Sequence, residues 1–341
     1  MPTATVTPPT ATPPTVAGRR TLGALLLIPA VAALLLWVFA WPAARIAPRD
    51  LPVGVAGPAA AAGAVEQRLG RHEGAFEVHR YEDAAAARAA VEARDVYGAV
   101  VVSPGGTELL TASAGSPAVA ALLREAVAAQ APGGAPVEVT DVVAAPAGDP
   151  RGAVLGASLL PLALVGAATG VATVLLGLRG ARAAAALTGA ATLAGLVGAA
   201  VAHSWLGALA GDWWAEAGVV GLTVLAIGAT FAGLATLVGK PGFGLAALLT
   251  ILLGNAYSGL SSAPELLPTA VGTLGQWLPP GAAISALRSV SAFDGAAAAG
   301  PLLVLSLWAA AGLLATALGA RRRRPAPTAA PTAPPVPAQA G

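Results

Sequence analysis

Three short runs decide the fold class: LPVGVA at residues 51–56, FEVHRY at residues 76–81 and VYGAVVV at residues 96–102. The first and third are apolar and each is followed by a Pro- and Gly-containing turn. The second alternates apolar with polar side chains, which is the period of a half-buried strand. Ala-rich runs at residues 59–69 and 82–93 separate the three and favour helix. Strands that alternate with helices indicate a small α/β domain with a mostly open sheet.

The same pattern continues towards residue 151. We expect an edge strand at residues 108–112, a helix at residues 117–130 that has Pro117 at its first position, and a last strand at residues 137–143. The whole block, residues 45–151, holds nine of the nineteen Lys and Arg residues. At about a hundred residues it is large enough for one hydrophobic core.

The composition of the whole chain indicates a membrane protein. Apolar residues make up 56%, charged residues 11%, and the mean hydropathy is +0.73, whereas soluble domains carry about 25% charged residues. The absence of cysteine excludes disulfides, thiol catalysis and Cys-ligated metals. A net charge of +2 does not suggest a nucleic-acid partner. The abundance of Ala, Gly and Pro, with Lys240 as the only lysine, is typical of a GC-rich bacterial genome.

The hydrophobic segments predict an α-helical polytopic protein with six transmembrane helices and the α/β domain inserted between helices 1 and 2. Residues 21–41 are about twenty apolar residues, enough to cross a bilayer. A secretory signal peptide has a shorter apolar core of about 7–15 residues, so we expect residues 19–44 to be retained as the first helix. A domain of five helices at residues 152–320 follows. Its expected spans are residues 153–178, 183–202, 217–238, 243–260 and 301–320.

Charges beside these segments predict the orientation. With six spans, nine basic residues fall on one side and only Arg288 lies in the short loops opposite. An excess of Lys and Arg marks the cytoplasmic side. We therefore expect a multi-pass plasma-membrane protein whose two termini are cytoplasmic and whose α/β domain is outside. The Pro-rich ends, residues 1–18 and the basic cluster with its tail at residues 321–341, are expected to be disordered cytoplasmic tails.

The outer loop at residues 261–300 is the most unusual connection. It is largely apolar but interrupted by prolines, so it either dips into the membrane against protein or lies on the outer interface. Both alternatives remain open at this point. The polar, aromatic and turn-forming side chains of this loop make it a candidate functional segment: Glu265, Trp277, Pro279, Pro280, Gly281 and Arg288.

Small residues recur within the second span. Gly152 and Gly156, and likewise Gly166 and Gly170, are four residues apart and therefore share a helix face. Such pairs allow neighbouring helix backbones to approach closely. The alternative is that GC-rich coding simply fills the spans with Ala and Gly.

No catalytic or nucleotide-binding motif emerges. Lys240 is followed by Pro241, and Leu234 stands where a phosphate-binding loop needs its first glycine. A hydrolase would need a serine such as Ser258 paired with His203, and no motif supports this pair. The spans carry no charged side chain in their middles, which disfavours a proton-coupled pump. We therefore expect neither an enzyme nor a bound cofactor or metal.

Several stretches resemble the permease subunits of type-2 ABC exporters, in particular the branch that includes phage-infection-protein-like membrane proteins. They are LPVGVA with AVVVSP at residues 99–104, LPPGAAISALR at residues 278–288, and FDG at residues 293–295 followed by PLLVLSLWAAAGLL at residues 301–314. The shared plan is one span, a large external domain and five more spans, and the resemblance covers about residues 19–324.

This resemblance implies an exporter permease that moves an unidentified substrate across the plasma membrane. It implies a homodimer in membrane lipid, energised by a separate ATP-binding subunit. The turn between the second and third spans, with Arg179 and Arg182, is the candidate docking site for that ATPase. The alternative is a non-transporting cell-envelope protein whose external domain binds a partner or acts as a receptor.

Overall fold

The computed structural model describes residues 16–130 and 137–322, and the chain divides into two compact units, residues 1–46 and 47–341. The first unit contains helix α1 (Val16–Ala43). Within it, Leu25–Ala43 is long and apolar enough to cross a membrane. The Arg45 guanidinium lies 5.1 Å from the centre of a Trp41 ring, an arrangement suited to a membrane interface. Of the tails predicted at residues 1–18 and 321–341, residues 1–15 and 323–341 lie outside the described residues, whereas residues 16–18 belong to α1 and residues 321–322 to the last helix, α12 (Ala299–Arg322).

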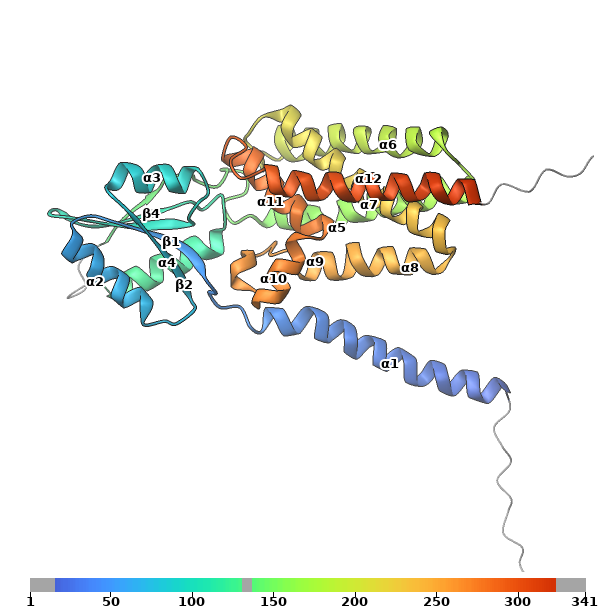
Figure 1. Ribbon diagram of the computed structural model, residues 1–341, viewed down its shortest axis with the longest axis horizontal. Coiled ribbons are helices and arrows are strands. Elements are labelled where there is room, and N and C mark those ends of the chain that lie inside the picture. Colours follow the sequence, from blue (N-terminus) through green and yellow to red (C-terminus); the bar gives the residue numbers. More distant parts are fainter. Residues whose placement is uncertain (1–15, 131–136, 323–341) are drawn as a thin grey trace, which may run out of the picture. The chain divides into compact units, whose positions relative to one another are not determined.

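The second unit begins with a five-stranded sheet of order β2-β1-β3-β4-β5 (Figure 1). Parallel pairing joins β1 to β2 and to β3, and β4 to β5, whereas β3 and β4 form an antiparallel hairpin. The predicted α/β domain is thus present, but the prediction of an edge strand at residues 108–112 is wrong. That segment pairs on both sides, because Leu109 and Leu110 point to opposite faces and both are buried. The strands are β1 (Leu51–Ala56), β2 (Phe76–Tyr81), β3 (Gly98–Ser103), β4 (Gly106–Thr111) and β5 (Glu138–Asp141).

Three helices cover the two faces of this sheet. Helix α3 (Ala84–Glu92) lies on one face, and α2 (Ala59–Gly70) and α4 (Pro117–Gln130) lie on the other (Figure 1). Alternation along the strands explains the division, since Val100 faces α4 while its neighbours Ala99 and Val101 face α3.

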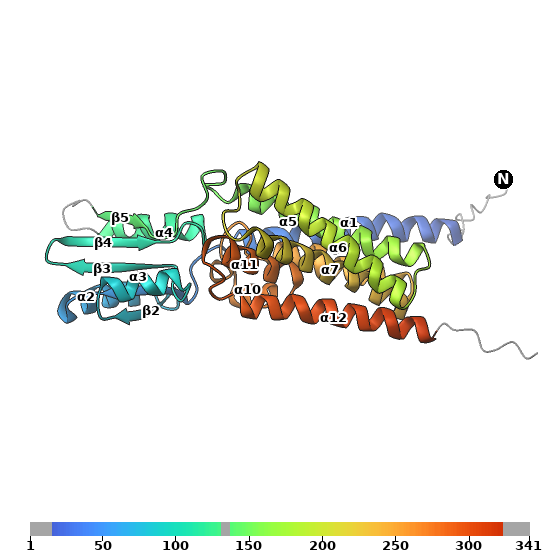
Figure 2. The ribbon, with the colours of Figure 1, turned by 90° about the horizontal axis from the view of Figure 1, so that it is seen from above.

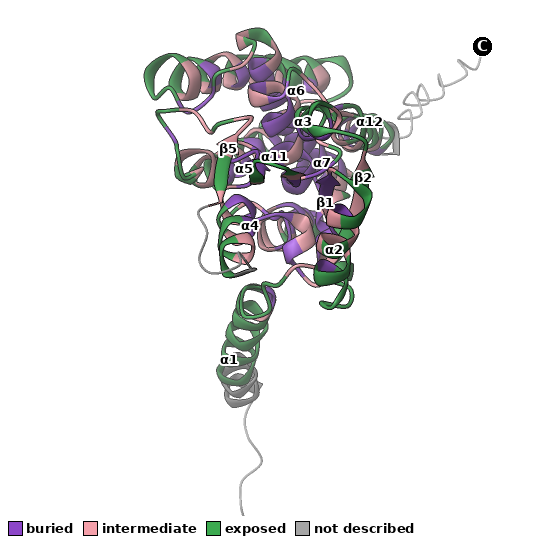
Figure 3. Ribbon diagram, turned by 90° about the vertical axis from the view of Figure 1, so that its left-hand side faces the viewer, coloured by how far each residue is buried: buried purple, intermediate pink, exposed green. Residues whose placement is uncertain are grey.

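Helices α5, α6, α8, α11 and α12 pack around α7 (Figures 1 and 2). About three quarters of the apolar window of α7 is buried, compared with a quarter of the windows of its neighbours, and Figure 3 shows α7 largely as buried. The helices are α5 (Ala153–Leu175), α6 (Ala181–Ala199) with η2 (Ala200–Trp205), α7 (Trp213–Val238), α8 (Pro241–Ala247), η3 (Leu248–Leu253), α9 (Gly254–Ala256), η4 (Pro264–Leu266), α10 (Thr269–Gln276), α11 (Pro279–Ala292) and α12 (Ala299–Arg322).

Five helices in the described residues are long and apolar enough to cross a membrane, so the count of six spans is not confirmed. The segment predicted at residues 243–260 forms the shorter apolar helix Pro241–Ala256. At about 1.5 Å per residue this helix covers about 24 Å, less than the roughly 30 Å of a bilayer core. It ends there because Tyr257 leaves helical geometry and Gly259 adopts a left-handed φ of 68°.

The segment between α9 and α12 joins the α/β domain to the helices. Ala263 and Leu266 belong to the core on the α4 face of the sheet, and Phe293 belongs to the core on the α3 face. From the same segment, Ala286 and Leu287 of α11 pack in the core of the helix bundle. The two parts therefore share hydrophobic cores, which explains why they form one compact unit.

Glycines of α5 allow close approach to α7. A Cβ on Gly170 would collide with the carbonyl of Gly228, and one on Gly166 would lie 2.9 Å from the Cβ of Ile227. A Cβ on Gly156 would meet nothing within 4 Å. The packing of α5 on α7 thus requires glycine at positions 166 and 170. Gly156 has no such packing role, which agrees with the alternative that the overall composition explains its presence.

Candidate functional site

The side chain of Arg94 leaves the α/β domain at the end of α3. The Arg94 N–H donates to Val91 and the Asp95 N–H to Ala90, and φ of Arg94 is 62°. Helices commonly end in this way, but the residue with positive φ is usually glycine. An arginine in this place carries backbone strain, and strain of this kind is typical of residues held for their side chains.

The guanidinium of Arg94 reaches α11. Its Nη1 donates to the Ser285 carbonyl at 3.1 Å and to the Ser289 hydroxyl at 2.5 Å. The same group lies 5.1 Å from the centre of the Phe293 ring, a cation–π distance. These contacts connect α3 to the segment that enters the helix bundle.

A second connection starts three residues further along the chain. The Tyr97 hydroxyl donates to Glu265 Oε2 at 2.7 Å. Burial raises the pKa of Tyr97, and the neighbouring Glu265 carboxylate raises this pKa further. The phenol therefore stays protonated and keeps its hydrogen bond across the whole neutral and mildly alkaline range.

Arg288 of α11 is the most buried cation near this point, with 5% of its surface exposed. Its Nη2 donates to the Leu260 carbonyl at 2.8 Å, the one side-chain hydrogen bond that Arg288 makes within the described residues. No carboxylate oxygen of those residues lies within 4.0 Å of it, so Arg288 is a buried cation without an ion-pair partner.

These side chains line a cavity of about 320 Å³ between the α/β domain and the outer segment. Arg94, Asp95, Glu265 and Arg288 supply its charges, and Pro52, Pro264 and Phe293 form part of its apolar wall. Exposed residues at its edge, Asp95 and Ala297, open it to solvent. The volume lies at the lower end of the range for small-molecule sites. The cavity therefore combines apolar walls with converging charged groups, as binding sites commonly do.

The titratable side chains in and near this cavity differ in how burial and neighbouring charges shift their pKa. Burial lowers the pKa of Arg94, while Tyr97 and Glu265 act in the opposite direction. Burial raises the pKa of Tyr81, and the neighbouring Asp95 carboxylate raises it further. Arg288 is buried, and Arg94 and Glu265 are half-buried, so these three groups hold two positive charges and one negative charge away from bulk water.

The structure brings together only two of the residues proposed from the sequence, Glu265 and Arg288. Pro279 and Pro280 occupy the first turn of α11, where proline needs no N–H partner. A Cβ on Gly281 would collide with the Gly275 carbonyl, so this glycine serves the packing of α10 on α11. Trp277 is 62% exposed, and its carbonyl accepts a hydrogen bond from the Trp308 indole at 2.8 Å.

Arg179 and Arg182 lie elsewhere. Both are exposed and flank the connection between α5 and α6. Helix α5 begins next to the α/β domain, where Gly152 lies against Pro117, and runs away from it, so this connection is at the far end of the bundle (Figure 2).

Sequence reasoning missed Arg94 and Tyr97. A usable signal for Arg94 was its place directly after a helical run, where a glycine would be expected to end the helix. Nothing in the sequence around Tyr97 distinguishes it from an ordinary strand aromatic.

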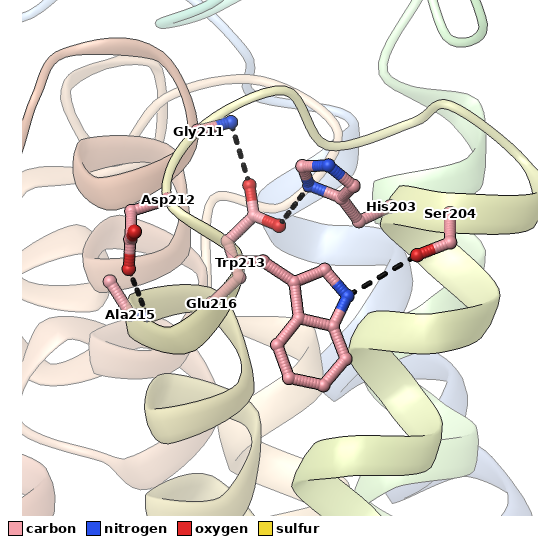
Figure 4. Close-up of polar contacts among 7 residues, drawn as sticks. All are labelled: His203, Ser204, Gly211, Asp212, Trp213, Ala215 and Glu216. Carbon is pink, nitrogen blue, oxygen red and sulfur yellow. Dashed lines mark hydrogen bonds and ion pairs between the residues drawn. The ribbon is translucent and has the colours of Figure 1, made fainter.

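A separate polar contact joins η2 to α7 (Figure 4). The carboxylate of Glu216 is fully buried, lies 2.8 Å from Nδ1 of His203 and accepts the Gly211 N–H at 2.9 Å. Ser258 is the serine that a hydrolase would need as the partner of His203. Its hydroxyl instead donates to the Asn255 carbonyl at 3.0 Å. His203 is therefore paired with an acid of α7, and the pair ties the end of one helix to the start of the next.

An apolar cavity of about 550 Å³ opens between the same helices, nearer to the α/β domain than to the far end of the bundle. Leu155 and Leu162 of α5, Val201 of η2 and Val220 of α7 are among the residues that line it. Its walls have almost no polar group.

Fold and site together define a mostly helical protein with about five apolar helices able to span a membrane and a small α/β region, which is the make-up of a membrane protein. Comparison with known proteins does not narrow this class. No family model, no curated protein and no solved structure matches the chain.

Proposed function

We propose that the chain is the transmembrane permease subunit of an ABC-type exporter in the plasma membrane. Two copies form one pathway for an unidentified substrate, and a separate ATPase supplies the energy. In this arrangement the α/β domain faces outward, both termini are cytoplasmic, and the segment at residues 243–260 completes the sixth passage of the membrane.

The observation that supports this proposal best is the sharing of cores by the segment between α9 and α12. Because Leu266 and Phe293 pack in the α/β domain while Leu287 packs in the bundle, a shift of α7 or α12 reaches the external domain through rigid contacts. A permease that alternates between states needs such a connection. A receptor domain that is merely anchored in the membrane does not.

The far end of the bundle is where an ATPase would dock. Arg179, Arg182 and Lys240 are exposed there and offer positive charge to an acidic surface. Purification of the full-length protein from native membranes should recover an ATPase. Replacing both arginines (Arg179→Gln with Arg182→Gln) should reduce its recovery while membrane insertion is unchanged.

A matched control uses two exposed arginines of the α/β domain. Arg71→Gln with Arg88→Gln removes the same charge from the opposite end and should leave recovery of the ATPase unchanged. If the wild-type protein brings down no ATPase, the chain is better explained as a non-transporting envelope protein whose external domain binds a partner.

A further inference from the structure

We propose that the cavity between the α/β domain and α11 binds a small organic molecule with a single carboxylate group. The cavity is lined by Arg94, Arg288, Glu265, Gln276 and Ser285 and has a volume of about 320 Å³. Nothing in the proposed permease role assigns a ligand to this place, and the inference stands or falls independently of transport.

The first argument is the state of Arg288. Its side chain is 5% exposed, yet it donates to a single carbonyl among the described residues and has no ion-pair partner there. Removing an uncompensated cation from water is costly, and a buried cation normally gains an anion as partner. A planar carboxylate matches the guanidinium fork, which can donate two parallel hydrogen bonds to it.

The second argument comes from Arg94, which approaches the same cavity from the other wall. The Arg94 side chain donates both of its hydrogen bonds through Nη1, which leaves Nη2 without a hydrogen bond in the described part of the chain. The residue is held in a strained left-handed conformation with φ 62°. Two arginines from different parts of the fold thus converge on one space, which is the geometry of an anion site.

Charge balance selects the class of anion. Arg94 and Arg288 contribute two positive charges, and Glu265 contributes one negative charge while it accepts the Tyr97 hydroxyl. Asp95 also lines the cavity, but it is exposed at the edge, where water screens its charge. Inside the cavity a monoanion therefore neutralises the excess positive charge of the two arginines over Glu265, whereas a phosphate dianion would leave an excess negative charge. The apolar walls, which include Val96 and Phe293, suit a short hydrocarbon body attached to the carboxylate.

The test measures binding to the full-length protein in a non-ionic detergent by titration calorimetry. The probes are hexanoate, 1-hexanol and hexyl phosphate. Hexanoate should bind, hexanol should not, and hexyl phosphate should bind more weakly than hexanoate. Tighter binding of the phosphate, or equal binding of the alcohol, would overturn the assignment to a monocarboxylate.

Variants then locate the site. Arg288→Met should weaken hexanoate binding by about tenfold or more, because a charge-assisted hydrogen bond is lost. Arg151→Met removes an exposed arginine that does not line the cavity and should change nothing.

A variant that should bind hexanoate more tightly provides a test that misfolding cannot imitate, since a misfolded protein would lose binding. Glu265→Gln keeps an acceptor for Tyr97 but removes the competing carboxylate, so hexanoate should bind several-fold more tightly than to the wild type. No binding by the wild type, or weaker binding by Glu265→Gln, would refute the proposal.

Discussion

The backbone conformation and the side-chain contacts of Arg94 favour different residues at this position. Its left-handed conformation suits glycine, while its guanidinium contacts Ser285, Ser289 and the Phe293 ring. Arg94→Ala loses the contacts and keeps the strain, whereas Arg94→Gly loses the contacts and relieves the strain. We therefore expect both variants to be less stable than the wild type, with Arg94→Gly the more stable of the two by about 1 kcal/mol.

Thermal unfolding of the purified protein measures this difference. If Arg94→Ala equals or exceeds Arg94→Gly in stability, the left-handed conformation carries no strain and the residue needs another explanation.

The raised pKa of Tyr97 predicts how the stability of the protein changes at alkaline pH. Its ordinary pKa of 10.0 applies to the unfolded chain, and burial together with Glu265 raises the pKa in the fold. Below about pH 10 both states hold the proton. As pH rises further the unfolded chain loses the proton first, so the contribution of Tyr97 to stability falls towards the folded-state pKa.

The melting temperature of the wild type should therefore decline between about pH 10 and about pH 12. Tyr97→Phe should show a shallower decline, although it is less stable at neutral pH. Tyr81→Phe is the comparison, because the Tyr81 pKa is also raised but its hydroxyl makes no hydrogen bond to Glu265. Equal slopes for wild type and Tyr97→Phe would contradict the prediction.

Among the elements, the contact of α5 with α7 offers a matched pair of glycines. Gly156→Ala adds a methyl group to open space and improves helix propensity, so it should stabilise the protein by about 0.5–1 kcal/mol. Gly170→Ala makes the same change of residue but drives the methyl group into the Gly228 carbonyl. It should destabilise the protein by about 1–3 kcal/mol.

Unfolding in mixed micelles compares the two substitutions. A stabilising effect of both would mean that α5 does not pack on α7 through Gly170.

At the scale of the whole molecule, the proposed topology can be tested by labelling, because the chain has no cysteine. Ala85→Cys and Ala270→Cys place a thiol at exposed positions of the α/β domain and of α10. Ala181→Cys places one, also exposed, at the far end of the bundle. In sealed cells an impermeant thiol reagent should modify the first two and not the third.

Permeabilised cells provide the control, since all three cysteines should then react. Modification of position 181 in sealed cells would exclude a cytoplasmic location for the turn between α5 and α6, and with it the proposed docking site.

The sequence by itself determined the elements whose pattern is local. The strands Leu51–Ala56 and Phe76–Tyr81 have the predicted bounds, and the long apolar helices begin and end within a few residues of the predicted ones. The reason is that hydrophobic periodicity and turn residues act over one element and can be read from it directly.

Only the tertiary structure decided how distant elements meet. Tyr97 and Glu265 are 168 residues apart, and Arg94 and Ser289 are 195 apart, yet each pair forms a hydrogen bond, and Arg94, Tyr97 and Glu265 line one cavity. The interior position of β4 in the sheet and the early end of the helix Pro241–Ala256 also depend on their neighbours rather than on their own patterns. Such contacts form because separate elements bury a common core. The sequence of one element alone does not indicate which distant element it will pack against.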